Sequence, residues 1–403
     1  MAVRPCTSLD EMRAAFAPIW HYFGQSPPAE DAVKHFHRVM RPERAHAVFA
    51  GDKAVAGSAA FEFDLTIPGG QVKAAGLTVV GVLPTHRRRG LLRDMMRAQI
   101  DAAHACNEPL AVLWPSQDSI YGQFGFGMAS QSAEIDVPRE RTAPYRDIPV
   151  VGTARIVPLD EAEPLVAPVY ARVAQETPGM FARSSAWWQD RILTDHPFRR
   201  QSGGALQCVV IEIDGVPAAY ALYRLNPWFE RGSSTGNTLV VEAMGEAPEA
   251  TYAIWRYLFG IDWLARLKAA YLPADHPMLL SLAEPRRLNF LLREGIWIRL
   301  IDVGAALSAR SYASDDAVVI EVTDEFCPWN AGRWRVARGG AERTSAEPDL
   351  ACEVQSLGCV YLGGFTFAAL ADALRVQRLR PGGVARADAL FRTDRRPWCP
   401  ELF

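Results

Sequence analysis

A chain of 403 residues is long enough for two or three domains, since single cores usually stop growing near about 250–300 residues. Hydrophobic residues make up 49% and charged residues 22% of it, which is ordinary for a globular protein with a sizeable core. The formal net charge of −3 provides no overall field that would recruit nucleic acid or an acidic membrane, and we expect neither as a partner.

The cysteines and the apolar runs indicate in which cellular compartment the protein is expected. The seven cysteines lack metal-binding spacing, and their odd number argues against a disulfide framework and favours a reducing environment. No uncharged apolar run approaches the roughly 18 residues of a membrane span, and the first residues lack the apolar core of a signal peptide. We therefore expect a soluble, cytoplasmic protein without a bound metal, and secretion stays open.

The first block, residues 1–150, is expected to alternate strands and helices. A helix with capping-box spacing starts at Ser8, and two strands form a hairpin around the turn at 51–53. An apolar strand then ends at Pro84, and after three arginines a helix runs over 91–106. The buried-looking strand PLAVLWP and the segment SQDSIYGQFGFGMAS follow. This order favours an α/β layer architecture.

The second block, residues 151–295, repeats the order of hairpin, strand, loop and helix, which suggests an internal duplication. Its loop, GEAPE, carries two carboxylates at Glu246 and Glu249 where the first block carries arginines. Such a loop would repel an anion, so only the first copy is expected to bind a phosphate-bearing ligand.

The third block, residues 296–403, begins with two antiparallel strands around a turn. The stretch LACEVQSLGCVYLGGFTFAALADALRV is expected to form a strand, a glycine-marked turn and a helix. The chain is apolar up to Phe403, unlike a charged, disordered tail.

The junction VVGVLPTHRRRGLLRDMM concentrates positive charge between a strand and a helix. The first amides of a helix lack intrahelical acceptors and lie at the positive end of its dipole, so the place suits a phosphate. Gly90 permits close backbone approach, and arginine supplies bidentate contacts. A solvated basic helix end, or a short nucleic-acid or targeting patch, remains the alternative.

This junction resembles the coenzyme A pyrophosphate loop of GCN5-related N-acetyltransferases (GNAT). Together with SIYGQFGFG and the aromatic C-terminus, the sequence is similar to the enhanced intracellular survival (Eis) family of these enzymes. The resemblance spans the chain and implies tandem GNAT domains with mixed sheets flanked by helices, the second copy being degenerate. A sterol-carrier-protein-like α+β domain would follow and supply the C-terminal carboxylate.

The resemblance also implies the site. The residues expected to bind acetyl-CoA are Val80, Gly81, Val82, Arg88, Arg89, Gly90, Leu91, Leu92, Arg93, Ser116 and Gln117. Tyr121 would be the general acid, and the carboxylate of Phe403 the general base. The residues alone leave Tyr121 open as a core aromatic and Phe403 as a docked apolar terminus. The family's tyrosine segment commonly has Glu, Arg and Tyr where this chain has Gln117, Gln123 and Phe126, which weakens any expectation of affinity for polycations.

By resemblance, the chain would transfer an acetyl group from acetyl-CoA, its co-substrate, to a primary amine of a small polar molecule, aminoglycoside-like or lysine-like. A homo-oligomer, specifically a hexamer, is implied in the same way. Two alternatives stay open. One is acetylation of protein lysines, and the other is a non-catalytic protein that senses coenzyme A and binds lipid through its third domain.

Overall fold

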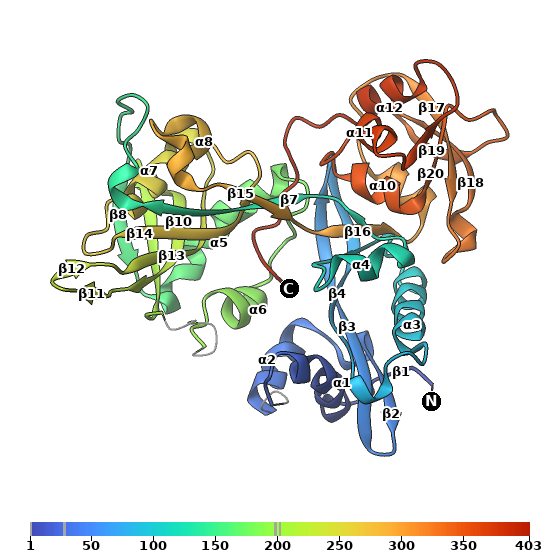
Figure 1. Cartoon of the computed structure of the whole chain (residues 1–403), viewed down its shortest axis with the longest axis horizontal. Helices are drawn as coiled ribbons and strands as arrows, with labels where there is room; N and C mark the ends of the chain where they lie inside the picture. Colours follow the sequence, from blue (N-terminus) through green and yellow to red (C-terminus); the bar gives the residue numbers. More distant parts are fainter. Residues whose placement is uncertain (1, 27–29, 197–199, 201–202) are drawn as a thin grey trace. The chain divides into compact units, whose positions relative to one another are not determined.

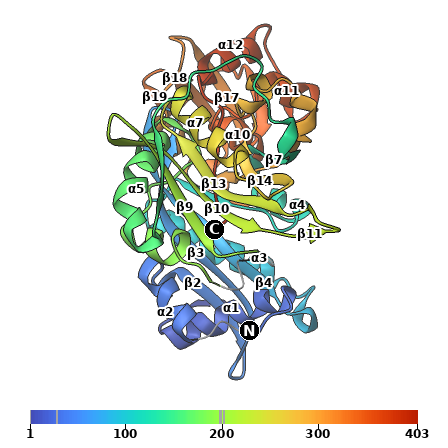
Figure 2. The ribbon, with the colours of Figure 1, turned by 90° about the vertical axis from the view of Figure 1, so that its left-hand side faces the viewer.

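The computed structural model describes residues 2–26, 30–196, 200 and 203–403, and their contacts form two compact units. Unit 1 consists of Met1–Ser130, Ile296–Pro397 and Leu402–Phe403, and unit 2 of Gln131–Gly295 and Trp398–Glu401. Figures 1 and 2 show the chain from two directions. The three-domain division of the sequence stays a prediction, because contacts group most of the first and third domains together.

Unit 1 contains a seven-stranded sheet that carries the candidate site. Its strands, in order, are β1 (Arg4–Pro5), β2 (Ala45–Ala50), β3 (Lys53–Ile67), β4 (Gly70–Val82), β5 (Leu110–Leu113), β16 (Trp297–Leu300) and β6 (Gly127–Met128). The predicted hairpin is confirmed as β2 and β3, which pair antiparallel. Strands β4 and β5 are parallel, and β16 pairs antiparallel with β5. The sheet thus takes one strand from the chain after residue 295.

Helices cover both faces of this sheet. Helices α1 (Leu9–Tyr22) and α2 (Glu30–Val39) lie on one side and α3 (Leu91–Ala105) on the other (Figure 1). Helix α3 buries an apolar stripe that begins with Leu91 and Met95, at the spacing of a helix that packs on a sheet. The predicted helix after the arginines is therefore confirmed. A short helix, α4 (Asp118–Tyr121), follows β5.

Unit 1 also contains a five-stranded sheet, formed by the chain after residue 316. Its order is β19 (Gly340–Arg343), β18 (Gly332–Ala337), β17 (Ala317–Thr323), β20 (Leu350–Glu353) and β21 (Val376–Arg378). The helices beside it are α9 (Val303–Ala309), α10 (Val354–Tyr361), α11 (Phe367–Asp372) and α12 (Gly383–Phe391). Helix α10 was missed by the sequence analysis. All its residues except Gln355 are buried, so it lacks the polar face that reveals an amphipathic helix.

Unit 2 has a sheet of the same plan. Its order is β15 (Leu291–Glu294), β7 (Gln131–Pro138), β14 (Arg266–Pro273), β13 (Asn237–Gly245), β10 (Val216–Asn226), β9 (Leu206–Ile213) and β8 (Thr153–Val157). Strands β13 and β14 are parallel, like β4 and β5. Its helices are α5 (Leu159–Glu176), α6 (Ser185–Trp187), α7 (Pro248–Phe259) and α8 (Met278–Ser281), and a small hairpin joins β11 (Phe229–Glu230) to β12 (Ser233–Ser234).

The shared plan supports the predicted duplication. Beside its parallel pair, each large sheet holds an antiparallel strand from another part of the chain, β16 in unit 1 and β7 in unit 2. Residues 131–150 were expected in the first domain, but β7 makes this segment part of unit 2. Pairing with a distant strand, rather than local pattern, decides where this segment belongs.

Candidate active site

Strand β4 extends beyond its neighbour β5 in unit 1. The two strands pair only at residues 74–76 of β4, which face 110–112 of β5, whereas β4 continues to Val82. Residues 77–82 therefore run on past the last pair with β5. Because a strand edge without a neighbouring strand offers backbone N–H and C=O groups in a row, this stretch can bind an extended chain such as a pantetheine arm.

A β-bulge interrupts β4 within the same stretch. Val79 and Val80 have no partner positions on β3, because the pairing passes from Thr78 directly to Gly81. Val79 has a φ of 48°, which is a strained, left-handed conformation for a β-branched residue. Amides displaced from the ladder by a bulge can donate hydrogen bonds to an oxyanion that forms beside the strand.

The arginine loop ends in an uncapped helix N-terminus. Gly90 precedes α3 with a φ of 80° and supplies no side-chain cap. The first backbone hydrogen bond of the helix joins the Asp94 amide to the Gly90 carbonyl, 3.0 Å apart. The amides of Leu91, Leu92 and Arg93 therefore lack intrahelical acceptors and suit an anion. The two leucine side chains pack into the core, so only their amides can contribute.

The predicted arginines differ in their surroundings. Arg88 is exposed and has a φ of 60°. Arg89 donates from Nη2 to the Thr85 carbonyl at 3.3 Å, within the loop itself. The Arg93 guanidinium lies 5.2 Å from the ring centroid of Phe326. Three exposed cations thus flank the open amides of α3.

Tyr121 is 5% exposed and closes α4, directly after β5. Its ring belongs to an apolar cluster with Leu77 and Leu113, which follow the last paired residues of β4 and β5. Burial raises the pKa of the Tyr121 hydroxyl, and a hydrogen bond with the Ser116 side chain partly opposes this effect. The phenol is protonated at neutral pH and can act as a donor. Ser116 and Gln117 are exposed.

The C-terminal residue also lies in unit 1, against β3. The Phe403 ring is 8% exposed and meets Phe63 edge to face, with the ring centroids 4.9 Å apart. Phe63 in turn covers Gly76, where an added Cβ would lie 2.2 Å from its ring. Since Gly76 is the last residue of β4 that pairs with β5, the terminal residue packs beside the place where the two strands part.

Phe63 was not singled out in the sequence analysis, although a signal was present. Phe61 and Phe63 flank one residue, and positions i and i+2 of a strand share a face. Both are buried, and their ring centroids lie 5.7 Å apart. An aromatic pair at this spacing marks an apolar face of β3 that the terminal phenylalanine extends.

The glycines of IYGQFGFG create space for other parts of unit 1. A Cβ at Gly125 would lie 1.5 Å from Nη1 of Arg299 on β16, and one at Gly127 would lie 2.0 Å from the Gln355 carbonyl of α10. Gly125 also has a φ of 83°. These contacts hold the turn that carries Tyr121. Arg299 was not identified from sequence, because an arginine in an apolar strand gives no sign of its buried partner.

The corresponding junction in unit 2 has opposite charge. Helix α7 begins at Pro248, and Glu246 before it forms an ion pair with Arg172. Glu249 lies in the first turn of the helix. Carboxylates at this place repel a pyrophosphate, which supports the expectation of a single coenzyme site.

The residues just before the C-terminus are anchored within unit 2. Arg183 is fully buried and pairs with Glu242 at 2.5 Å and with Glu401 at 2.6 Å. The Trp187 indole donates to Glu401 at 2.9 Å, and the Arg183 guanidinium lies 3.8 Å from the Tyr170 ring centroid. One buried cation thus bridges two carboxylates, and burial raises the pKa of Glu401.

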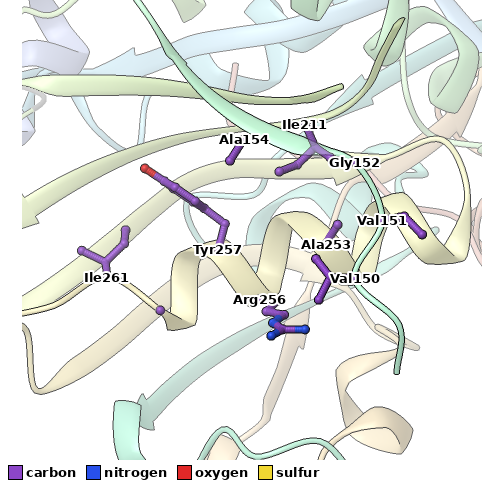
Figure 3. Close-up of a pocket in the computed structure, with 10 residues that line it drawn as sticks. Val150, Val151, Gly152, Ala154, Ile211, Ala253, Arg256, Tyr257 and Ile261 are labelled. Atoms are coloured by element: carbon purple, nitrogen blue, oxygen red, sulfur yellow. The ribbon is translucent and has the colours of Figure 1, made fainter. Parts of the chain in front are cut away.

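A hollow in unit 2 does not have the properties of a second active site. About 470 Å³ in volume, it lies between residues 150–154 and α7 (Figure 3). Its walls are mostly aliphatic, apart from Arg256 and Tyr257, and the Tyr257 hydroxyl is 3.0 Å from that of Tyr223. The residues lining it include no acid–base pair that could assist acyl transfer.

The part of the chain that the structure describes also bears on metal binding and on membrane insertion. Within it, no group of three or more His, Cys, Asp or Glu side chains is arranged to hold a metal ion. None of the described helices combines the length and apolarity needed to cross a bilayer.

Family profiles match three parts of the chain. A profile for an acetyltransferase (GNAT) domain matches residues 2–129, and a second profile of the same description matches 179–300. A profile for a sterol carrier protein domain matches residues 303–400. These matches confirm the predicted fold class of two GNAT domains followed by a sterol-carrier-like domain.

Relatives extend over nearly the whole chain. An uncharacterised N-acetyltransferase of Streptomyces avermitilis is 40% identical over 389 residues, which is 94% of each chain. The N-acetyltransferase Eis of Mycobacterium tuberculosis is 31% identical over 357 residues, 85% of this chain and 84% of that protein. The crystal structure of Eis1 from Mycobacterium abscessus, 31% identical, superposes with a TM-score of 0.86 and covers 100% of both chains. The chain therefore belongs to the Eis family of GCN5-related N-acetyltransferases.

Proposed function

We propose that the chain transfers an acetyl group from acetyl-CoA to a primary amine of a small polar molecule, by direct attack in a ternary complex. An acetyltransferase of the GNAT type uses acetyl-CoA as its acyl donor, so the proposal concerns the acceptor, the residues and the order of events. The observation that carries it is the stretch of β4 beyond Gly76, which is bulged at Val79 and leads into the open N-terminus of α3.

The donor would occupy β4 and the arginine loop. The pantetheine arm adds to the strand edge at Val80, Gly81 and Val82, and the pyrophosphate reaches the amides at the start of α3. Arg88 and Arg89 contribute positive charge there. This arrangement directs the thioester toward the bulge, where an amide N–H stabilises the oxyanion.

Acyl transfer then needs the acceptor nitrogen to lose its protons and the sulfur to gain one. The amine attacks the thioester carbon and forms a tetrahedral intermediate, which collapses to the amide and a thiolate. Tyr121 donates its proton to the departing sulfur, a role that suits a phenol kept protonated by burial. The carboxylate of Phe403 orients the ammonium group and accepts the proton whose loss frees the amine to attack. The nitrogen loses a second proton as the intermediate collapses, and that proton returns to the Tyr121 phenolate. Holding both substrates in register contributes more than either transfer.

The acceptor is proposed to be an aminoglycoside-like or lysine-like amine. The Phe403 ring lies against Phe63, and the carboxylate of the same residue would give an ammonium group an anionic partner near these rings. Acetylation of a protein lysine is the second candidate and uses the same residues. Lipid binding without catalysis is less well supported, because the outward arginines of β18 form ion pairs, as Arg335 does with Glu342.

A thiol-release assay tests this function. Purified protein with acetyl-CoA is offered aminoglycosides, polyamines and lysine peptides, and we expect turnover with an aminoglycoside or a lysine-like amine. A chain lacking Phe403, and one extended by a few residues past it, should both lose activity because the carboxylate is removed or displaced. If the extended chain turns over acetyl-CoA at an unchanged rate, the assignment of the Phe403 carboxylate as general base is wrong, even when the enzyme class is right. The homohexamer and the cytoplasmic location also remain proposals, and light scattering checks the former.

A further inference from the structure

A four-residue segment of the third domain, 324–327, contacts both halves of the candidate site. It follows β17 in unit 1, and the Phe326 side chain is 4% exposed. Phe326 belongs to the same apolar cluster as Tyr121. No catalytic or binding role was expected of any residue in this segment, which we call the brace.

On one side the brace contacts the coenzyme helix α3. The Arg97 guanidinium lies 3.8 Å from the Phe326 ring centroid, and Arg93 lies 5.2 Å from the same ring. Arg97 also donates to the Phe326 carbonyl. Arg93 is one of the residues expected to bind acetyl-CoA, so the ring would fix the orientation of a cation beside the coenzyme.

On the other side the brace contacts the turn that carries Tyr121. The Phe326 and Phe124 rings meet edge to face with centroids 5.3 Å apart. Asp324 pairs with Arg299 at 2.6 Å, and the Arg299 guanidinium lies against Gly125. The backbone amide of Cys327 donates to Asp324 at 2.9 Å, which fixes the conformation of the brace itself.

We propose that Phe326 is a positioning residue of the acetyltransferase site, holding Arg93 toward the coenzyme and the Tyr121 turn in register with it. The inference depends on the proposed function and deepens it, since it assigns the sterol-carrier-like domain a part in acetyl-CoA binding. In this role Phe326 would act through Arg93 and Phe124, whose side chains it contacts. Because the Phe326 ring contacts both α3 and the turn that carries Tyr121, it couples acetyl-CoA binding to the position of the general acid.

The experiment compares Phe326→Leu, Phe326→Tyr and a matched control, Trp329→Leu. Leucine keeps most of the apolar volume of Phe326 but removes the aromatic ring, whereas tyrosine keeps the ring. Trp329 belongs to the same domain and contacts the same helix at its far end, with its ring centroid 4.8 Å from that of His104. Steady-state kinetics give KM for acetyl-CoA and kcat, and calorimetry gives the Kd of coenzyme A without turnover.

We expect Phe326→Leu to raise KM for acetyl-CoA and Kd for coenzyme A about three- to tenfold, as loss of cation–π contacts implies. Phe326→Tyr should have KM and Kd values close to those of the wild type, and Trp329→Leu should leave both values within about twofold of the wild type. Equal effects of the two leucine variants would show that the domain merely docks on α3 and would overturn the inference. If the wild-type protein is active and Phe326→Leu has the same KM and Kd as the wild type, the inference about Phe326 is refuted while the proposed function stands. Wild-type protein that neither turns over nor binds coenzyme A would refute the proposed function as well.

Discussion

Replacing Gly125 with alanine should destabilise unit 1 far more than the same change at another glycine with positive φ. The φ of 83° at Gly125 would cost an alanine roughly 1–2 kcal/mol. The new Cβ would also lie 1.5 Å from Nη1 and 2.7 Å from Cζ of Arg299, and 2.9 Å from Cγ1 of Val354. The guanidinium has to move before the alanine can be accommodated.

That movement breaks a buried ion pair. Arg299 is 0% exposed, and its Nη2 lies 2.6 Å from Oδ2 of Asp324. Separating such a pair leaves an uncompensated buried charge and costs about 3–5 kcal/mol. With the backbone strain, the expected loss is about 4–7 kcal/mol, a large part of the stability of a typical domain. Gly51→Ala is the control, since Gly51 has a φ of 61° and no atom within 4 Å of the new Cβ.

Urea unfolding followed by tryptophan fluorescence measures the two variants against the wild type. We expect Gly51→Ala to lower the free energy of unfolding by roughly 1–2 kcal/mol and Gly125→Ala to lower it several times more. In an Arg299→Leu background, Gly125→Ala should no longer cost the ion pair and should keep only the backbone strain and the contact with Val354. Equal losses for the two glycines, or an unchanged cost in that background, would refute Arg299 as the cause.

Three more predictions concern the acid, a buried histidine and the buried charges of unit 2. Tyr121→Phe should lower kcat by about 100-fold or more with little change in KM. Since burial raises the pKa of Tyr121 above its usual 10, any loss of rate from tyrosine ionisation should have its midpoint above pH 10 in the wild-type pH–rate profile. Burial lowers the pKa of His276 from 6.5 to about 3, and its Nδ1 accepts a backbone amide, so the unfolded state binds the proton first as the pH falls. As the pH falls below 6.5, the free energy of unfolding of the wild type should therefore decrease faster than that of His276→Gln. The difference between the two slopes should approach about 1.4 kcal/mol per pH unit, measured by urea unfolding between pH 7 and pH 5. Equal slopes for the two proteins would contradict this. Arg183→Met should cost about 3–5 kcal/mol, because two buried carboxylates lose their cation. Adding Glu242→Gln and Glu401→Gln to that variant should recover stability, and no recovery would argue against charge as the reason.

Local signals in the sequence were sufficient for the elements around the arginine loop. The capping pattern at Ser8, the turn at Gly51 and the apolar spacing after Gly90 each depend on neighbours in sequence, and the structure confirms the helices and the hairpin that they predict. The Ser8 hydroxyl accepts from the Glu11 amide at 3.2 Å, as a capping residue should. Short-range physical chemistry therefore located the candidate coenzyme site.

Features that depend on distant pairing could not be predicted. Strand β16 joins β5 across nearly 200 residues of sequence, and β7 joins β14 in unit 2, although neither segment carries a sign of its partner. The same holds for Phe63, whose role depends on the chain's last residue, and for Phe326, whose ring contacts α3 from the third domain. Burial and long-range contact, rather than periodicity, define these positions.

A crystal structure of the protein with acetyl-CoA tests the central claim most directly. The pantetheine arm is predicted to run along Val80–Val82 of β4, and pyrophosphate oxygens should lie within hydrogen-bond distance of the Leu91, Leu92 and Arg93 amides. The thioester oxygen should face the bulge at Val79. Acetyl-CoA seated elsewhere on the chain, with the start of α3 in contact only with solvent, would contradict the account.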